Sequence, residues 1–153
     1  NGAAVADCNI CEFQTIPQDR PLVVHFSANN PNDFARAAKL VEPYCDAVDL
    51  NLGCPQRTAY LGHFGSYLLG DDDRELVLNI VRGGSQAVSI PIFVKIRLLD
   101  TIEETIKLCH QLRDAGASLI AIHARCKYIM LLPNIAMLFE TFYSQFVYSY
   151  RQG

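Results

Sequence analysis

The chain has 153 residues, half of them apolar and about a fifth charged, with a net charge of −3. This balance is typical of a folded globular domain, and it argues against a disordered chain or a uniformly basic surface for nucleic acid. No apolar stretch approaches the roughly 18 residues of a membrane span, so we expect no membrane partner. The chain begins at Asn1 without a signal-peptide pattern, which predicts a fragment or a processed product.

Strand and helix patterns alternate along residues 1–125. Buried strands are predicted at the apolar runs 21–26, 47–52, 91–98 and 118–123. Each run is followed by a more polar segment, and three of these segments have apolar residues at helical spacing. The resulting βαβαβαβ order implies a parallel sheet with right-handed crossovers, which is an α/β fold.

End signals mark the three predicted helices. Asn32–Asp33 is expected to cap the first helix. The second follows a glycine-rich loop, with Asp71–Asp73 at its start and Gly83–Gly84 as its stop. Thr101 and Glu104 have the spacing of a capping box at the start of the third.

The composition changes at Cys126. Residues 126–153 hold seven of the fifteen aromatic side chains, and the spacing of Ile129–Phe139 is compatible with a helix. We therefore divide the chain into a βα domain over 1–125 and a divergent apolar tail over 126–153. The tail is either a helix packed on the sheet edge or foreign sequence.

The six cysteines do not resemble a disulfide framework, because they are scattered through a chain that can build a core. Reduced thiols in the cytoplasm are favoured, with the nucleus as the alternative compartment. Cys8 and Cys11 have the spacing of a metal-binding pair, but no second pair accompanies them. We therefore predict no metal site.

Polar side chains recur toward the ends of the four predicted strands, where ligands bind in parallel α/β sheets. They are His25, Asn51, Lys95, Arg97, His123 and Arg125, together with Cys54 just beyond the second strand. One polar strand end is usually a solvated surface group, but four in succession favour a binding or catalytic site.

Three of these residues have more than one interpretation. Cys54, between a glycine and a proline, is a buried inert thiol, a proton donor or a nucleophile. Lys95 lies inside an apolar strand and needs a partner, either an anionic cofactor or Asp49. His123 is a hydrogen-bonded core histidine or a ligand-binding group.

Several segments resemble the tRNA-dihydrouridine synthases. Residues 49–56 (Asp-Leu-Asn-Leu-Gly-Cys-Pro-Gln) resemble the signature of that family, and 62–68 resemble its next glycine-bearing segment. Val94–Arg97 is similar to its lysine strand, and Ile122–Arg125 to its His-Gly-Arg. The signature and the run Arg20–Phe26 are most similar to the eukaryotic branch that acts on tRNA positions 16 and 17.

The resemblance implies a (β/α)₈ barrel of the TIM type that binds FMN, of which about four central βα units are present. It implies that NADPH or NADH reduces the flavin, which reduces uridine in the D-loop of tRNA to 5,6-dihydrouridine. Hydride goes to C6 of the uracil, and Cys54 gives a proton to C5. The substrate base has to leave its stack to reach the flavin.

The resemblance also implies the roles of the other site residues. The residues implied for the cofactor are Lys95, His123, Asn51 and His25, although the family usually has glutamine at the position of His25. Asn51, Arg97 and Arg125 are implied for the substrate.

Because only part of the barrel is visible, we expect this chain by itself to bind FMN weakly or not at all and to be inactive. Two alternatives remain. One is an FMN barrel oxidoreductase that acts on a small pyrimidine. The other is a non-catalytic half-barrel that acts by association through its unpaired sheet edges.

Overall fold

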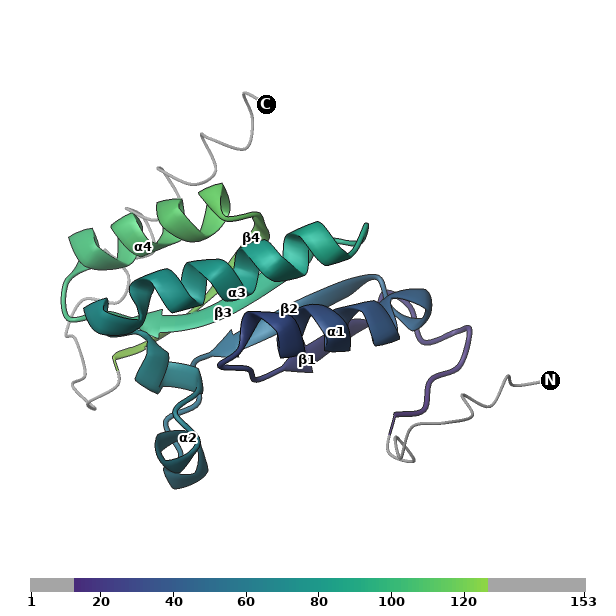
Figure 1. The fold of residues 1–153 in the computed structure, drawn as a ribbon, viewed down its shortest axis with the longest axis horizontal. Coiled ribbons are helices and arrows are strands. Elements are labelled where there is room, and N and C mark those ends of the chain that lie inside the picture. Colours follow the sequence, from purple (N-terminus) through teal and green to yellow (C-terminus); the bar gives the residue numbers. More distant parts are fainter. Residues whose placement is uncertain (1–12, 127–153) are drawn as a thin grey trace.

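A computed structural model describes residues 13–126, with side chains through residue 124, as a four-stranded parallel sheet (Figure 1). The strands pair in chain order and are β1 (Val23–Phe26), β2 (Ala47–Leu52), β3 (Ile92–Leu98) and β4 (Ala117–Cys126). The connecting helices are α1 (Pro31–Val41), α3 (Arg74–Ala87) and α4 (Ile102–Asp114). A short helix, α2 (Arg57–Leu61), precedes α3.

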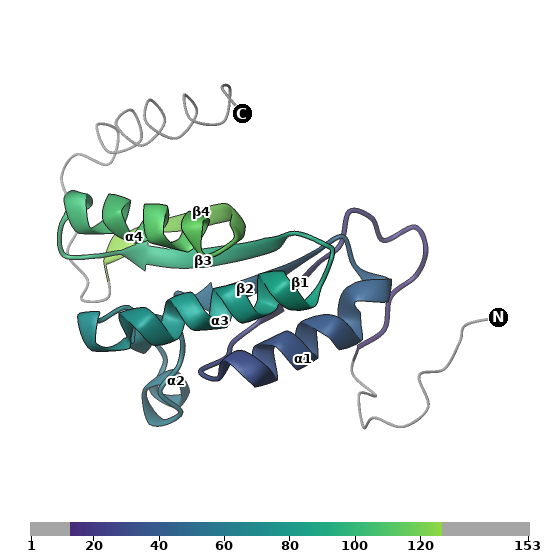
Figure 2. The same ribbon diagram turned by 45° about the horizontal axis from the view of Figure 1, so that its top comes forward.

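All three connecting helices cover the same face of the sheet, as two views of the molecule show (Figures 1 and 2). A doubly wound sheet carries helices on both faces, whereas each unit of a (β/α)₈ barrel places its helix on the outer face. The predicted fold class, part of a TIM barrel, is therefore confirmed. The predicted tail over 126–153 lies outside the described residues, apart from Cys126 at the end of β4.

The strands alternate between a helix-covered face and an open face. In β3, Ile92, Val94, Ile96 and Leu98 are buried under the helices, and the intervening side chains are half-buried. The same alternation gives β2 its buried Leu50 and Leu52. The core therefore lies between the sheet and the helices, and the polar residues of β2 and β3 are directed to the open face.

The first helix begins earlier than the sequence predicts. Its N-cap is Asn30, whose side-chain oxygen accepts hydrogen bonds from the backbone N–H groups of Asn32 and Asp33 at 2.9 and 3.3 Å. Pro31 occupies the first helical position, where a missing N–H costs nothing. The predicted cap at Asn32–Asp33 is therefore wrong, because Asn30 already satisfies both of those N–H groups.

The glycine pair Gly83–Gly84 does not end α3, which continues to Ala87. A β-carbon on Gly84 would lie only 2.5 Å from a ring carbon of Phe34, a buried side chain of α1. Glycine here lets two helices approach closely. The predicted stop is wrong because contact between the helices, and not helix termination, explains this glycine.

The ends of α4 agree with the sequence prediction. Thr101 and Glu104 form the reciprocal hydrogen bonds of a capping box. The helix ends at Asp114 with Ala115 as its C-cap, and Gly116 follows with a φ of +112°. This left-handed conformation is one that glycine adopts without strain.

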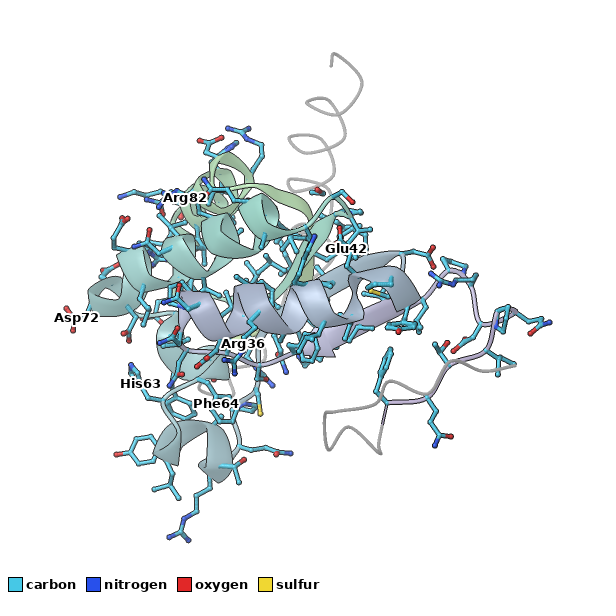
Figure 3. All side chains as sticks on the ribbon, turned by 45° about the vertical axis from the view of Figure 1, so that its right-hand side comes forward. Arg36, Glu42, His63, Phe64, Asp72 and Arg82 are labelled. Carbon is cyan, nitrogen blue, oxygen red and sulfur yellow. The ribbon has the colours of Figure 1, made fainter. Side chains whose placement is uncertain are left out.

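The predicted glycine-rich loop contains structure of its own. It holds α2 and two 3₁₀ turns, Gly65–Leu68 and Asp71–Asp73, before α3 begins at Arg74. Figure 3 shows His63 and Phe64 where the chain leaves α2 to return to the sheet. The backbone N–H of Phe64 donates to the carbonyl of Ala59, which closes α2 against this returning segment.

Candidate functional site

Five of the predicted site residues lie on the open face of the sheet, the face opposite α1, α3 and α4. They are His25, Asn51, Lys95, Arg97 and His123, from all four strands. Register pairs Asn51 with Lys95 and Arg97 with His123. Paired residues of neighbouring strands share a face, so the sheet brings together side chains that are far apart in sequence.

His25 and Asp49 form the first contact on this face. They are paired across β1 and β2, and His25 Nδ1 lies 2.6 Å from Asp49 Oδ2. The other oxygen of Asp49, Oδ1, is buried and has no hydrogen-bond partner among the described residues. The predicted alternative in which Asp49 pairs with Lys95 is therefore wrong, because the ion pair of this carboxylate is with His25 and none joins it to Lys95 among the described residues.

Gly53, at the carboxyl end of β2, is held by two side chains of the open face. Its N–H donates to Asn51 Oδ1 at 2.9 Å, and its carbonyl accepts from Arg97 Nε at 2.6 Å. Because its oxygen is engaged, the Asn51 amide keeps its N–H₂ group for another acceptor. The terminal guanidinium nitrogens of Arg97 are likewise left to bind another acceptor, whereas its Nε is used in the hydrogen bond to Gly53 at the end of β2.

Lys95 is half-buried between these groups. A β-carbon built on Gly53 would lie 3.4 Å from Lys95 Nζ, so the ammonium reaches across to the end of β2. Among the described residues it has neither a hydrogen bond nor an ion pair. A half-buried ammonium without a partner suits an anionic or strongly polar ligand on this face.

Cys54 follows directly, and its backbone is fixed by the segment after α2. The Cys54 carbonyl accepts hydrogen bonds from both the N–H and the hydroxyl of Ser66, at 3.0 and 2.9 Å. Pro55 offers its carbonyl to the Tyr67 hydroxyl at 3.1 Å. The sequence prediction missed Ser66, although the glycine-bearing segment around Gly65 was the signal that could have found it.

The three cysteines whose side chains the structure describes differ in exposure. Cys54 is half-buried, whereas Cys45 and Cys109 are buried. Burial raises the pKa of the Cys45 thiol and raises that of Cys109 to about 12. Those two thiols behave as core side chains, which leaves Cys54 as the described thiol available for chemistry.

Two further predicted residues lie on β4. His123 is half-buried and pairs in register with Arg97, which places it at the same end of the open face. Arg125 belongs to β4, and its side chain lies outside the described part of the chain. The open face therefore has His123 next to the Asn51–Lys95–Arg97 group.

The part of the chain that the structure describes shows no cluster of three metal-ligating side chains. The pair Cys8 and Cys11 lies outside the described residues. No helix within 13–126 is long and apolar enough to cross a membrane.

Comparison with known proteins identifies the family of this chain. Residues 6–134 match the family described as dihydrouridine synthase (Dus). The chain belongs to the dihydrouridine synthase family. The predicted family is thus confirmed, and the four motifs that indicated it, from 49–56 to 122–125, lie within the matched residues.

Relatives with reviewed names are similar over most of this chain. A mouse protein named "tRNA-dihydrouridine(16/17) synthase [NAD(P)(+)]-like" is 40% identical over 120 residues, 78% of this chain and 24% of that protein. The Saccharomyces cerevisiae "tRNA-dihydrouridine(16/17) synthase [NAD(P)(+)]" is 44% identical over 109 residues, 71% of this chain and 25% of that protein. A human "tRNA-dihydrouridine(20a/20b) synthase [NAD(P)+]-like" is 38% identical over 117 residues, 74% and 36% of the two chains. This dihydrouridine synthase chain spans about a quarter of the first two relatives.

The open face fits the ring system of a flavin. Among the described residues, the Lys95 ammonium has neither a hydrogen bond nor an ion pair, and the amide N–H₂ group of Asn51 has no acceptor. A flat heterocycle with carbonyl oxygens would accept hydrogen bonds from both. The described residues therefore suit the ring system of a flavin.

Proposed function

We propose that this chain supplies the uracil-reducing centre of a tRNA-dihydrouridine synthase that uses FMN with NADPH or NADH. The observation that carries the proposal is the cluster of Asn51, Lys95 and Arg97 beside the Cys54 turn on the open face. The relatives' names support the tRNA substrate and the nicotinamide reductant. Their names also favour tRNA over the small pyrimidine of the alternative oxidoreductase.

FMN, held by Asn51, Lys95 and the other residues of the open face, would supply a hydride for C6 of the uracil ring. Cys54 gives the proton that adds to C5, so the C5=C6 double bond becomes a single bond. The thiolate left on Cys54 then regains a proton from solvent. A thiol suits this role because it can give a proton, and the Cys54 thiol is carried by a fixed turn.

The other residues bind and orient. Lys95 places its positive charge where a flavin gains negative charge on reduction, which stabilises the reduced ring. Asn51 directs its amide N–H₂ to a carbonyl of the flavin or the uracil, since its oxygen is held by Gly53. His25, oriented by Asp49, offers the cofactor its free ring nitrogen in place of the amide that is usual in the family.

His123 and Arg125 complete the centre from β4, His123 toward the cofactor and Arg125 toward the RNA. A tRNA substrate is consistent with a reaction in the cytoplasm, with the nucleus as the alternative compartment. Because β1 and β4 are the outer strands of the described sheet, self-association through these edges also belongs to the proposal.

Exchanging this chain's residues into an active relative tests the proposal. The matched 109 residues of the yeast (16/17) relative are replaced by those of this chain, and dihydrouridine formation on unmodified tRNA is measured by mass spectrometry. We expect activity in the exchange protein and its loss on Cys54→Ala, while NADPH still bleaches the flavin absorbance at an unchanged rate.

Cys109→Ala, at a buried thiol away from the open face, is the matched control and should keep both half-reactions. Dihydrouridine formation that survives Cys54→Ala would refute the role of Cys54. An exchange protein that binds FMN and is reduced by NADPH, but leaves tRNA unmodified, would favour the non-catalytic alternative.

A further inference from the structure

The turn that carries Cys54 is fixed at three successive carbonyls by residues that are distant in sequence. Arg97 Nε donates to the carbonyl of Gly53 at 2.6 Å, Ser66 donates twice to that of Cys54, and the Tyr67 hydroxyl donates to that of Pro55. An ordinary surface turn leaves such carbonyls to water. The hydrogen bonds therefore fix the backbone of this turn from two directions.

Gly65 brings the clamping segment into contact with Cys54. Its φ is +64°, and a β-carbon there would lie 2.8 Å from the Cys54 carbonyl oxygen and 2.9 Å from the Cys54 β-carbon. Both the backbone conformation and the space therefore require glycine at this position. The close approach is what lets the next residue, Ser66, reach the Cys54 carbonyl with two donors.

The Ser66 side chain is almost completely buried, with 1% exposed, and its hydroxyl donates to the Cys54 carbonyl. A buried hydroxyl has to be paired, so its direction is fixed by this bond. Because cysteine has a single side-chain torsion, the backbone of Cys54 sets the few positions that its sulfur can occupy. A misplacement of about 1 Å in a reacting group can lower a rate by about 100-fold.

We propose that Gly65 and Ser66 are positioning residues for the Cys54 thiol, which they hold toward the open face through the Cys54 backbone. The inference rests on the proposed function for its catalytic meaning. The structural part of the inference, that Gly65 and Ser66 determine the position of the Cys54 thiol, does not depend on the reaction.

Alkylation of single cysteines in the purified chain tests this inference. The native chain is treated with iodoacetamide, and the rates at Cys54, Cys45 and Cys109 are followed by peptide mass spectrometry. In Ser66→Ala and Gly65→Ala we expect the rate at Cys54 to change at least about threefold, with the larger change in Gly65→Ala. Cys45 and Cys109 should stay protected, because they are buried in the core.

Ser85→Ala is the matched control. It also removes a serine hydroxyl that donates to backbone carbonyls, those of Arg82 and Ala115, but far along the sequence from the Cys54 turn. It should leave the Cys54 rate unchanged. Unchanged Cys54 rates in both test variants would overturn the inference, and so would equal increases at all three thiols, since the segment would then support the whole fold.

The same variants in the exchange protein give a kinetic measurement. We expect Ser66→Ala to lower kcat for uridine reduction about tenfold, with KM for tRNA and the rate of flavin reduction unchanged. If the proposed function failed, every protein would leave tRNA unmodified while the alkylation pattern persisted. If the positioning inference failed, tRNA would be reduced normally by both variants.

Discussion

Replacing Gly84 with alanine should weaken the packing of α1 on α3 and lower the free energy of unfolding. The same change at its neighbour Gly83 should raise the free energy of unfolding. The Gly84 β-carbon would lie 2.5 and 2.9 Å from two ring carbons of Phe34. Phe34 is buried with 1% of its surface exposed, and Ile92 Cδ1 also lies 3.6 Å from the new methyl group. The ring therefore has little room to move away.

The magnitudes follow from two opposing effects. Alanine gains about 1 kcal/mol over glycine in a helix interior. Overpacking of a buried site costs about 1–3 kcal/mol, and an overlap this deep belongs toward the upper end. Gly84→Ala should therefore destabilise the chain by about 1–2 kcal/mol. At Gly83 the nearest atom, the Pro31 carbonyl oxygen, is 3.5 Å away, so Gly83→Ala should stabilise by about 0.5–1 kcal/mol.

Urea denaturation followed by circular dichroism measures both variants. With an m-value of about 1–3 kcal/mol/M, the unfolding midpoint of Gly84→Ala should lie below that of the parent chain and the midpoint of Gly83→Ala above it. The midpoints of the two variants should differ from each other by about 1 M. An m-value equal to that of the parent would show that the compactness of neither state has changed. Midpoint shifts of the same sign and size in both variants would refute the reasoning, because helix propensity alone would then explain them.

Three other substitutions test separate contacts. Lys39 and Ser89 hold the pKa of Glu42, at the end of α1 (Figure 3), at about 2 against an ordinary 4.5. Between about pH 2 and pH 4.5 the unfolded chain therefore binds more protons than the folded chain. The parent should have a higher free energy of unfolding than Glu42→Gln at pH 7 and should lose that difference as the pH falls to about 2. A difference that persists at about pH 2 would contradict this reasoning. Thr101→Ala should cost about 1 kcal/mol in urea unfolding, because it removes the N-cap bond to Glu104; no loss would mean that the capping box is not stabilising. Lys95→Met should weaken FMN binding by about tenfold in a fluorescence titration of the exchange protein, with the exposed Lys107→Met as control; equal affinities would remove Lys95 from the flavin site.

The strands and the capping box could be predicted from the sequence because their signals are local. The apolar runs at 47–52 and 91–98 lie within one residue of β2 and β3. The capping box needs only Thr101 and Glu104, three residues apart. Such patterns depend on the backbone's own period and hydrogen bonds, so neighbouring residues suffice to show them.

Other features depend on contacts that no local pattern contains. The local sequence predicts that Gly84 ends a helix, whereas in the folded chain this glycine makes room for the Phe34 ring of α1. The sequence predicts Asp49 as one of two alternative partners of Lys95, but β1 brings His25 to within 2.6 Å of the Asp49 carboxylate. These contacts depend on strand register and on how closely two helices pack, which are set by residues tens of positions apart.

By itself, the sequence of this chain determined its family and its βα order, and it predicted the residues of the candidate site, Cys54 among them. The tertiary structure decided how those groups work together. It directed Asn51, Lys95 and Arg97 to one open face, and it placed Ser66 on the carbonyl of Cys54. The physical reason is that a motif is recognised from neighbouring residues in the sequence, whereas these hydrogen bonds join residues that are distant in sequence. They form only when the parallel strands pair in register and the segment after α2 returns to the end of β2.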